Sequence, residues 1–227
     1  MKINADLTKR AVVNSRLVDW VASLLPGVDR KMLERDGDEV ARVTSIVRYA
    51  SGSSFSPHVH TGGEEFIVLE GIFSDETGDF ETGTYVRNPV GSSHKPSSEF
   101  GCQIFVKLWQ MPPDDQAYVR INIHQKEDWQ TGEQEGELVF PLHHTGYEKV
   151  GVTQWSAGFE ASELRSYRGG VEFFVLSGSF SDASGRYKKG VWLRLPIGAS
   201  HTPKSDEGCM VYIKTDHLMH DLAKPPK

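Results

Sequence analysis

The stretch that decides the fold runs from Gly52 to Gly71 and reads G-S-S-F-S-P-H-V-H-T-G-G-E-E-F-I-V-L-E-G. His58 and His60 are two positions apart, so on a β-strand both side chains point to the same face. Glu64 follows a turn signal, T-G-G, at the start of an apolar run. Two imidazoles and a carboxylate that converge across a hairpin can hold a divalent transition metal, and His94 offers a fourth donor.

The composition is that of a globular protein rich in short strands. The chain has 227 residues, of which 38% are hydrophobic and 25% charged, with 22 glycines and 11 prolines. Many short aromatic and β-branched runs separated by turn residues favour an all-β fold. The net charge of −6 and the pI near 5.8 indicate no dedicated nucleic-acid surface, and we expect no nucleic-acid partner.

The beginning of the chain and its cysteines bear on location. The first ten residues, M-K-I-N-A-D-L-T-K-R, hold no apolar segment of a signal peptide, and no apolar run of the sequence reaches the length of a membrane span. We therefore expect a cytoplasmic protein without a membrane partner. Cys102 and Cys209 are the only cysteines, which fits a reducing compartment, and we expect both to be buried and unbonded.

An internal duplication organises the chain. Shifted by 107 positions, residues 60–107 align without a gap on residues 167–214, and 22 of the 48 positions are identical. Each copy contains its own set of strand and turn signals, so two packed barrels or sandwiches are the expected architecture. We predict a first, metal-competent barrel over residues 1–113, with an N-terminal edge segment, and a second barrel over residues 114–227, with a degenerate metal site and a C-terminal tail.

The spacing of these residues resembles the cupin superfamily. Its first motif, G-x5-H-x-H-x3,4-E-x6-G, is matched from Gly52 to Gly71 at every step. Its second motif, G-x5-P-x-G-x2-H-x3-N, is matched at Gly83, Pro89, Gly91 and His94, with Ser98 in place of the final asparagine. The resemblance implies an all-β bicupin of two antiparallel jelly-roll barrels. It also implies one divalent metal in the first barrel, with these ligands: His58, His60, Glu64 and His94.

Within the superfamily the chain is most similar to the ChrR-like cupin group. The similarity lies in H-x-H-x-G-G-E-E-F-I-V-L-E-G, F-S-D-E-x-G, G-x-Y-V-R-N-P and the later G-C. That group implies an anti-sigma factor that binds zinc and controls a sigma factor. Residues 1–40 contain neither histidine nor cysteine, however, so the zinc-binding anti-sigma domain is missing and a sigma-factor partner is doubtful.

The second copy has lost most of the metal set. The positions that match the four ligands are Arg165, Tyr167, Val171 and His201. Valine cannot coordinate a metal, so we expect no second metal site. Two interpretations remain open. Either an anion-binding pocket is formed by Arg165, Tyr167, Arg168 and His201, or this copy is a structural partner only.

The first copy leaves metal and function open. The resemblance makes zinc the first expectation, whereas iron, manganese, nickel and cobalt suit the same ligands. One hypothesis is a regulatory or sensory protein in which the metal reports a small-molecule ligand or an oxidant. The alternative is a metal-dependent oxidoreductase such as a cupin dioxygenase, and a storage or purely structural bicupin is a third. The sequence does not decide whether the protein is an enzyme or whether it forms oligomers.

Overall fold

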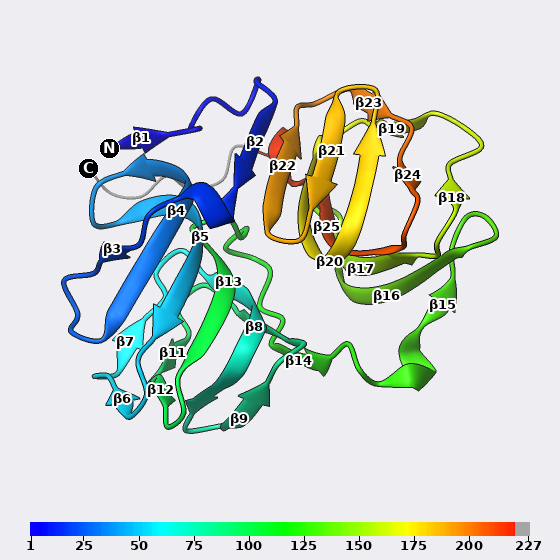
Figure 1. Ribbon diagram of the computed structural model, residues 1–227. Coiled ribbons are helices and arrows are strands. Elements are labelled where there is room, and N and C mark those ends of the chain that lie inside the picture. The colour runs from blue at the N-terminus through cyan, green and yellow to red at the C-terminus, as the bar shows by residue number, and fades with distance from the viewer. Residues whose placement is uncertain (221–227) are drawn as a thin grey trace. The chain divides into compact units, whose positions relative to one another are not determined.

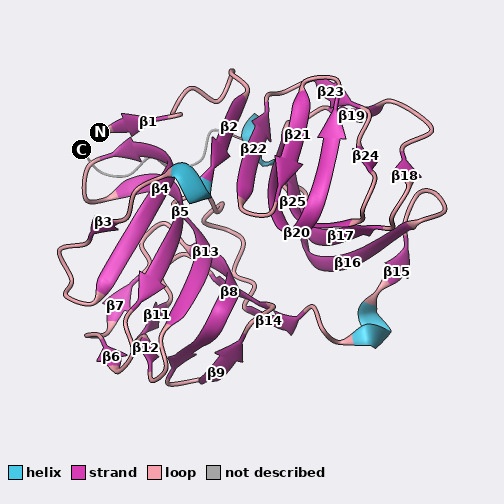
Figure 2. Cartoon of the chain, viewed as in Figure 1, coloured by secondary structure: helices cyan, strands magenta, loops and turns pink. Residues whose placement is uncertain are grey.

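The computed structural model describes residues 1–220, and nearly all of its regular structure is β-strand (Figure 2). The helices are limited to three short 3₁₀ turns, η1 (Ser15–Leu17), η2 (Lys126–Asp128) and η3 (His217–Met219). None of the helices in this part of the chain has the length and hydropathy to cross a membrane. The expected all-β class is confirmed.

Two compact units make up the protein, and neither is continuous in sequence. The first unit contains Met1–Ala5 and Val18–His124, and the second contains Asp6–Leu17 and residues 125–220. The division predicted at residue 113 separates the two repeats of the sequence, whereas the compact units exchange one strand across it. Residues 221–227, the end of the predicted C-terminal tail, lie outside the described residues.

The strands of the first unit are named in chain order in Figure 1. They are β1 (Lys2–Ile3), β3 (Val21–Ala22), β4 (Val28–Gly37), β5 (Ala41–Tyr49), β6 (Ser53–Ser54), β7 (His58–Val59), β8 (Glu64–Asp75), β9 (Gly78–Glu81), β10 (Thr84–Asn88), β11 (Ser93–His94), β12 (Ser97–Ser98), β13 (Cys102–Leu108) and β14 (Val119–Asn122). The main antiparallel path runs β1-β4-β5-β13-β8-β10-β14, and β7 and β11 form a separate two-stranded ribbon.

The second unit repeats this arrangement. Its strands are β2 (Ala11–Asn14), β15 (Gln130–Thr131), β16 (Glu137–His144), β17 (Lys149–Trp155), β18 (Phe159–Glu160), β19 (Arg165–Tyr167), β20 (Val171–Asp182), β21 (Gly185–Lys188), β22 (Val191–Leu195), β23 (Ala199–His201), β24 (Lys204–Ser205) and β25 (Cys209–Thr215). The main path runs β15-β16-β17-β25-β20-β22-β2, and β19 and β23 form the separate ribbon. Two jelly-roll units of the expected bicupin kind are therefore present.

One strand in each unit comes from the other repeat. In the second unit, β2 pairs antiparallel with β22, and Figure 1 shows this blue strand beside the orange one. In the first unit, β14 pairs in the same way with β10. The segment around Ala11–Asn14, predicted as an edge strand, is indeed the last strand of its sheet, but that sheet belongs to the second unit.

Each unit encloses its own apolar core. In the first unit the core gathers Phe66, Phe73, Val86 and Ile104, and in the second it gathers Phe173, Phe180, Leu193 and Val211, among others. These side chains come from alternate positions of paired strands, as expected where one face of a sheet is buried. The repeated strands therefore build two cores of the same plan.

A repeated glycine shows how tightly the strands pack. Gly71 has a φ of +73°, and a Cβ at this position would lie 2.1 Å from the carbonyl oxygen of Gly101. Gly178 has a φ of +66°, and its Cβ would lie 2.0 Å from the carbonyl oxygen of Gly208. Only glycine fits so close an approach with a positive φ. This glycine is kept in both copies because the fold needs it.

Candidate metal centre

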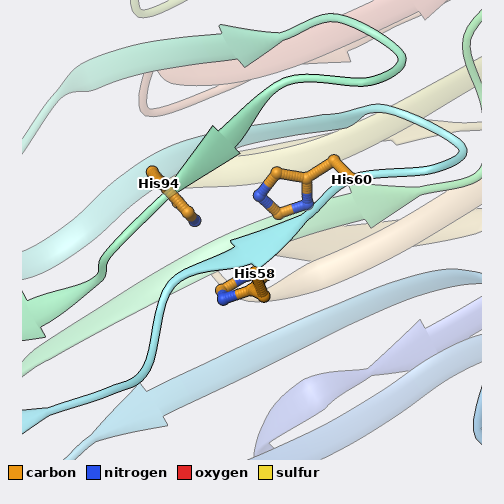
Figure 3. A group of neighbouring side chains, drawn as sticks. All are labelled: His58, His60 and His94. Atoms are coloured by element: carbon orange, nitrogen blue, oxygen red, sulfur yellow. The ribbon is translucent and has the colours of Figure 1, made fainter.

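Three histidines meet at the β7–β11 ribbon of the first unit. His58 in β7 pairs directly with His94 in β11, which places both rings on one face of the ribbon. His60 follows β7, and its backbone is held by hydrogen bonds with Ser92 and Gly91 of the opposite segment, at 2.8 and 2.9 Å. One ring nitrogen from each histidine lies within 4.8 Å of those from the other two, and Figure 3 shows the rings turned toward one another.

Glu64 joins this group from the first position of β8. Its Oε2 lies 3.4 Å from His60 Nε2 and 3.7 Å from His94 Nε2. The carboxylate is buried, as are the rings of His60 and His94, whereas His58 is exposed. The structure thus brings together all four residues that the motifs predict, although their role as ligands remains a prediction.

The chemistry of the donor set fits a metal ion. Among the described residues, His60 Nε2 is buried and has no hydrogen-bond partner. Burial lowers the pKa of His60, and the neighbouring His94 and His58 lower it further against the opposing charge of Glu64. A neutral imidazole is the form that coordinates a metal. A buried ring nitrogen without a partner, facing a carboxylate and two more imidazoles, is what a divalent cation would satisfy.

A second layer of side chains orients the donors. Asp75 Oδ2 accepts from the far side of the His94 ring, with 3.3 Å between Oδ2 and Nδ1. Asn88 donates to Glu64 Oε2 at 3.0 Å, and Arg120 in turn donates to the Asn88 side-chain oxygen at 2.6 Å. Such partners fix ring and carboxylate orientations in metal sites and increase ligand basicity.

The pKa of His94 reflects this layer. Burial, the largest contribution, lowers the pKa, but the Asp75 hydrogen bond and the Glu64 carboxylate together outweigh it, so the pKa is raised. The pKa of Asp75 is held below its ordinary value, because its bonds to His94 and Thr77 outweigh the opposite effect of burial. An ionised Asp75 therefore faces His94 at neutral pH.

A cavity of about 310 Å³ opens beside the histidines within the first unit. It is bordered by His58, His60 and Glu64 at one side, and its walls are largely apolar. The apolar wall residues include Val28, Val43, Val47, Tyr49, Phe55, Ile104, Val106, Leu108 and Trp109. The donor set therefore faces a space that a small molecule could enter.

The corresponding place in the second unit is occupied by internal pairs. Arg165 donates two hydrogen bonds to Glu137, of 2.6 and 3.1 Å. Its positive charge is therefore paired with a buried carboxylate. Tyr167 Oη lies 3.2 Å from His201 Nε2, and His201 Nδ1 lies 3.2 Å from Asp182. Arg165 is therefore already engaged, which weakens the predicted anion pocket, although a cavity of about 890 Å³ borders it.

Other predicted roles are structural, as the residues around them show. Glu65 lies on the strand face opposite Glu64 and accepts hydrogen bonds from Tyr85 and Arg87, at 2.6 and 3.1 Å. Ser98 donates to the carbonyl of Ile72 at 2.6 Å and takes no part in the site.

Both cysteines are buried and unbonded, as expected. Burial raises the pKa of the Cys102 thiol to about 11 and that of Cys209 to about 12. Neither is therefore a thiolate at neutral pH.

A family model described as the ChrR cupin-like domain matches the chain twice, over residues 8–112 and 117–219. The chain belongs to this cupin family. Each match begins before the strand that its repeat gives to the other unit, β2 in the first copy and β14 in the second. Cupins typically bind a divalent metal, and the histidine group of the first unit could hold one. No curated protein matches the chain.

Solved structures share the cupin fold across nearly the whole chain. A protein from Nostoc punctiforme described as a "putative dioxygenase" superposes with a TM-score of 0.72 at 12% identity, covering 97% of this chain and 88% of its own. YhhW from Escherichia coli gives 0.65 at 13% identity, with 91% and 97% covered. A deletion mutant of Bacillus subtilis oxalate decarboxylase gives 0.63 at 13%, with 91% and 76% covered. At such identities the likeness shows the fold alone.

The motif comparison missed the supporting residues Asp75, Asn88 and Arg120. A signal for Asn88 was present, since the second copy has Leu195 at the matching position and loses Glu64 as well. Asp75 gave no such signal because Asp182 repeats it and also faces a histidine. Arg120 lies in the strand exchanged between the repeats, so its place beside Asn88 could not be inferred from the order of the sequence.

Proposed function

We propose that the first unit is a divalent metal centre that acts on a small organic molecule, and that the protein is a metal-dependent enzyme. The observation that carries this proposal is the cavity beside His58, His60 and Glu64. A purely structural metal site is closed by its protein ligands, whereas a catalytic site keeps access for a further ligand. An apolar cavity with a few convergent polar groups is the usual form of a small-molecule site.

The four donors do not determine which metal ion binds. Three imidazoles and one carboxylate suit Zn²⁺, Fe²⁺, Mn²⁺, Co²⁺ or Ni²⁺, and intrinsic affinities do not separate these ions in a cell. When bound, such an ion would supply a Lewis acid that polarises an oxygen donor of the substrate. We favour iron for the oxidoreductase form of the proposal and zinc for a regulatory form.

The chain's own residues have definable parts in this proposal. His60 and His94 would hold the ion from buried positions, and His58 from the exposed edge. Glu64, held by Asn88 at 3.0 Å, borders the cavity, so its free oxygen could accept a proton from a bound molecule. The apolar walls would exclude water from the bound molecule and orient it toward the donors.

The experiment is metal analysis followed by spectroscopy of cobalt-substituted protein. We expect about one metal per chain, and a change in the visible cobalt bands when catechol, a bidentate oxygen donor, is added. The His58→Ala/His60→Ala variant should show neither metal nor bands. A metal-free wild-type protein would refute the site, and cobalt bands that catechol leaves unchanged would refute the open coordination position.

A second candidate, a regulatory or sensory protein, is favoured by the match to the ChrR cupin-like family. In this form the metal is zinc, held tightly by all four residues, and loss or oxidation of the site would be the signal. The cobalt spectrum separates the two candidates, because a closed tetrahedral site gives intense bands that added catechol does not alter.

A further inference from the structure

Two arginines face the cavity of the first unit, and the register of β4 explains why. Along β5, alternate residues line the cavity, and they include Val43 and Val47. Arg30 pairs with Val47 and Arg35 pairs with Val43, so both arginines share the face of these valines. Both arginines also border the cavity. The cavity that His58 and His60 border is therefore also bordered by two arginines.

A shift of register in β4 places Arg30 and Arg35 on the same face of the strand. Residues 30 and 35 differ in parity, so in a regular strand they would point to opposite faces. The pairing of β4 with β5 slips by one residue between Met32 and Glu34, in the manner of a β-bulge. Such a bulge re-aims the side chains beyond it. Here it turns Arg35 toward the cavity and leaves Glu34 on the opposite face of the sheet, where it is buried and pairs with Arg42.

Arg30 has unused hydrogen-bonding capacity. Its side chain is only 22% exposed, and its closest ionic partner is Glu39, at 3.9 Å, which is beyond hydrogen-bonding distance. Within the described residues Arg30 donates no side-chain hydrogen bond. A guanidinium group carries five N–H donors in a planar fork that matches a carboxylate. A mostly buried guanidinium without such a partner is unusual, because burial of unpaired charge is costly.

Arg35 holds a second positive charge close by. It donates to the backbone carbonyl of Asp38 in the β4–β5 turn and is buried. Burial, the largest effect, and the charge of Arg30 lower the pKa of Arg35 and outweigh the opposite effect of Glu39 and Asp38. The charged groups that border the cavity are thus Arg30, Arg35, Glu39 and Glu64, in addition to the two histidines. Glu39 is 67% exposed, so water screens its charge more than that of Arg30, which is 22% exposed.

The second unit shows that the fold does not require these arginines. In β16, the residues with the same pairing are Val139, opposite Thr153, and His144, opposite Lys149. The same slip of register occurs there, between Pro141 and His143. The bulge is therefore shared by both units, whereas only the first unit has arginines at these two positions.

We propose that Arg30, supported by Arg35, binds the carboxylate of a small organic acid whose body lies in the apolar cavity and whose other end meets the metal centre. This inference rests on the proposed function, since it names the substrate class of the same site. The substrate is then a small carboxylic acid with an oxygen donor at the end remote from its carboxylate. The volume of about 310 Å³ limits it to a single ring or a short chain.

The test compares matched probes on metal-loaded protein by calorimetry. Three catechol acids of increasing length are used: 3,4-dihydroxybenzoate, 3,4-dihydroxyphenylacetate and 3-(3,4-dihydroxyphenyl)propanoate, each against its amide and against catechol. We expect at least one acid to bind roughly tenfold more tightly than its amide, the effect of one charged hydrogen-bonded pair. In Arg30→Gln that preference should disappear while the affinity for catechol is retained.

Arg48→Gln is the control. Arg48 lies on the neighbouring strand, is 44% exposed and pairs with Asp29 at 2.7 Å, away from the residues that border the cavity. This variant should keep the preference. If no acid exceeds its amide by more than twofold, or if Arg30→Gln keeps the preference, the inference is wrong although catechol binding shows that the metal centre stands. If neither metal nor catechol binds the wild-type protein, the proposed function itself fails.

Discussion

The two units have the same fold but place different side chains in its interior. Both place a two-stranded ribbon next to a buried histidine, and both set an aspartate behind that ring, Asp75 behind His94 and Asp182 behind His201. The first unit surrounds its histidine with two more imidazoles and a carboxylate, whereas the second fills the space with a bidentate Arg165–Glu137 pair. The comparison separates what the fold needs from what the site needs.

Some residues kept in both copies are structural, as their contacts show. Gly71 and Gly178 permit the same close approach of strands, and Ser98 and Ser205 donate to equivalent backbone carbonyls, those of Ile72 and Ser179. The residues that differ gather around the candidate metal centre. The differences find three of the four predicted ligands, whereas His94 and its partner Asp75 are repeated in the second copy as His201 and Asp182.

The largest expected effect is the loss of the metal from the first unit. Replacing His60 with alanine removes a buried donor whose Nε2 has no protein hydrogen bond among the described residues. We expect the metal content, measured by plasma mass spectrometry, to fall from about one ion per chain to near zero. Tyr167→Ala is the matched change in the second unit and should leave the content unchanged. Retention of the metal by the His60 variant would show that the site lies elsewhere.

The converse experiment builds the site into the second unit. The required changes follow from the matching positions: Glu137→Val, Arg165→His, Tyr167→His, Val171→Glu and Leu195→Asn. Removal of the Arg165–Glu137 pair as a whole avoids leaving one buried charge alone, a change that would cost about 3–5 kcal/mol. We expect metal content to rise toward two ions per chain.

A control for that graft omits Val171→Glu and keeps the other four changes. It should bind the second ion more weakly, because one donor is missing. If the complete graft folds, as judged by circular dichroism, yet gains no metal, the four donors are insufficient and the comparison of the two units misses a required residue.

A smaller effect is expected from the aspartate behind His94. Asp75→Asn keeps the shape but removes the charge that faces Nδ1, at 3.3 Å. Loss of such a supporting carboxylate typically weakens metal affinity by about 10–100-fold. Competition with a chromophoric chelator measures this, and Asp182→Asn supplies the control, with unchanged affinity. Equal affinities for wild type and Asp75→Asn would reduce Asp75 to a structural role.

The smallest effect concerns acid stability of the second unit. Burial alone would raise the pKa of Glu137, but hydrogen bonds from Arg165 and Trp155 outweigh it and hold the pKa below the ordinary value of 4.5. A depressed pKa contributes stability that is present above that ordinary value and is lost as the pH falls through the folded-state pKa. The unfolding temperature of the second unit should therefore decrease below about pH 4.5.

The comparison variant for acid stability is Glu137→Gln. It should start from a lower unfolding temperature at pH 7 and show a flatter dependence between pH 5 and 3, as followed by scanning calorimetry. If the unfolding temperature of both proteins fell equally between pH 5 and 3, Glu137 would not be the cause of the loss of stability in acid.

The fold and the four donors could be predicted because short sequence patterns and the internal repeat indicate them. The spacing of His58 and His60, the turn before Glu64 and the repeat at a shift of 107 residues are all visible without coordinates. Strand alternation also accounts for Glu65, which lies on the face opposite Glu64 and pairs with Arg87. Each of these inferences uses neighbours in sequence or a comparison of the two copies.

What could not be predicted depends on pairing between distant strands. Arg120 supports Asn88 only because β14 lies beside β10, and the sequence order gives no sign that a strand of the second repeat completes the first unit. Arg35 faces the cavity only because β4 slips by one residue near Leu33. A bulge changes which side chains point inward, and residue types alone do not reveal it.

The exchange of β2 and β14 between the two repeats has a consequence for synthesis of the chain. Residues 11–14 leave the ribosome among the first, yet their partner strand, residues 191–195, is made near the end. Until then the early strand keeps an unsatisfied edge, and the sheet that it closes cannot be finished. A gene cut between the repeats would give two halves that each carry the wrong closing strand. Two such halves, expressed together, should recover the native pairing only by association.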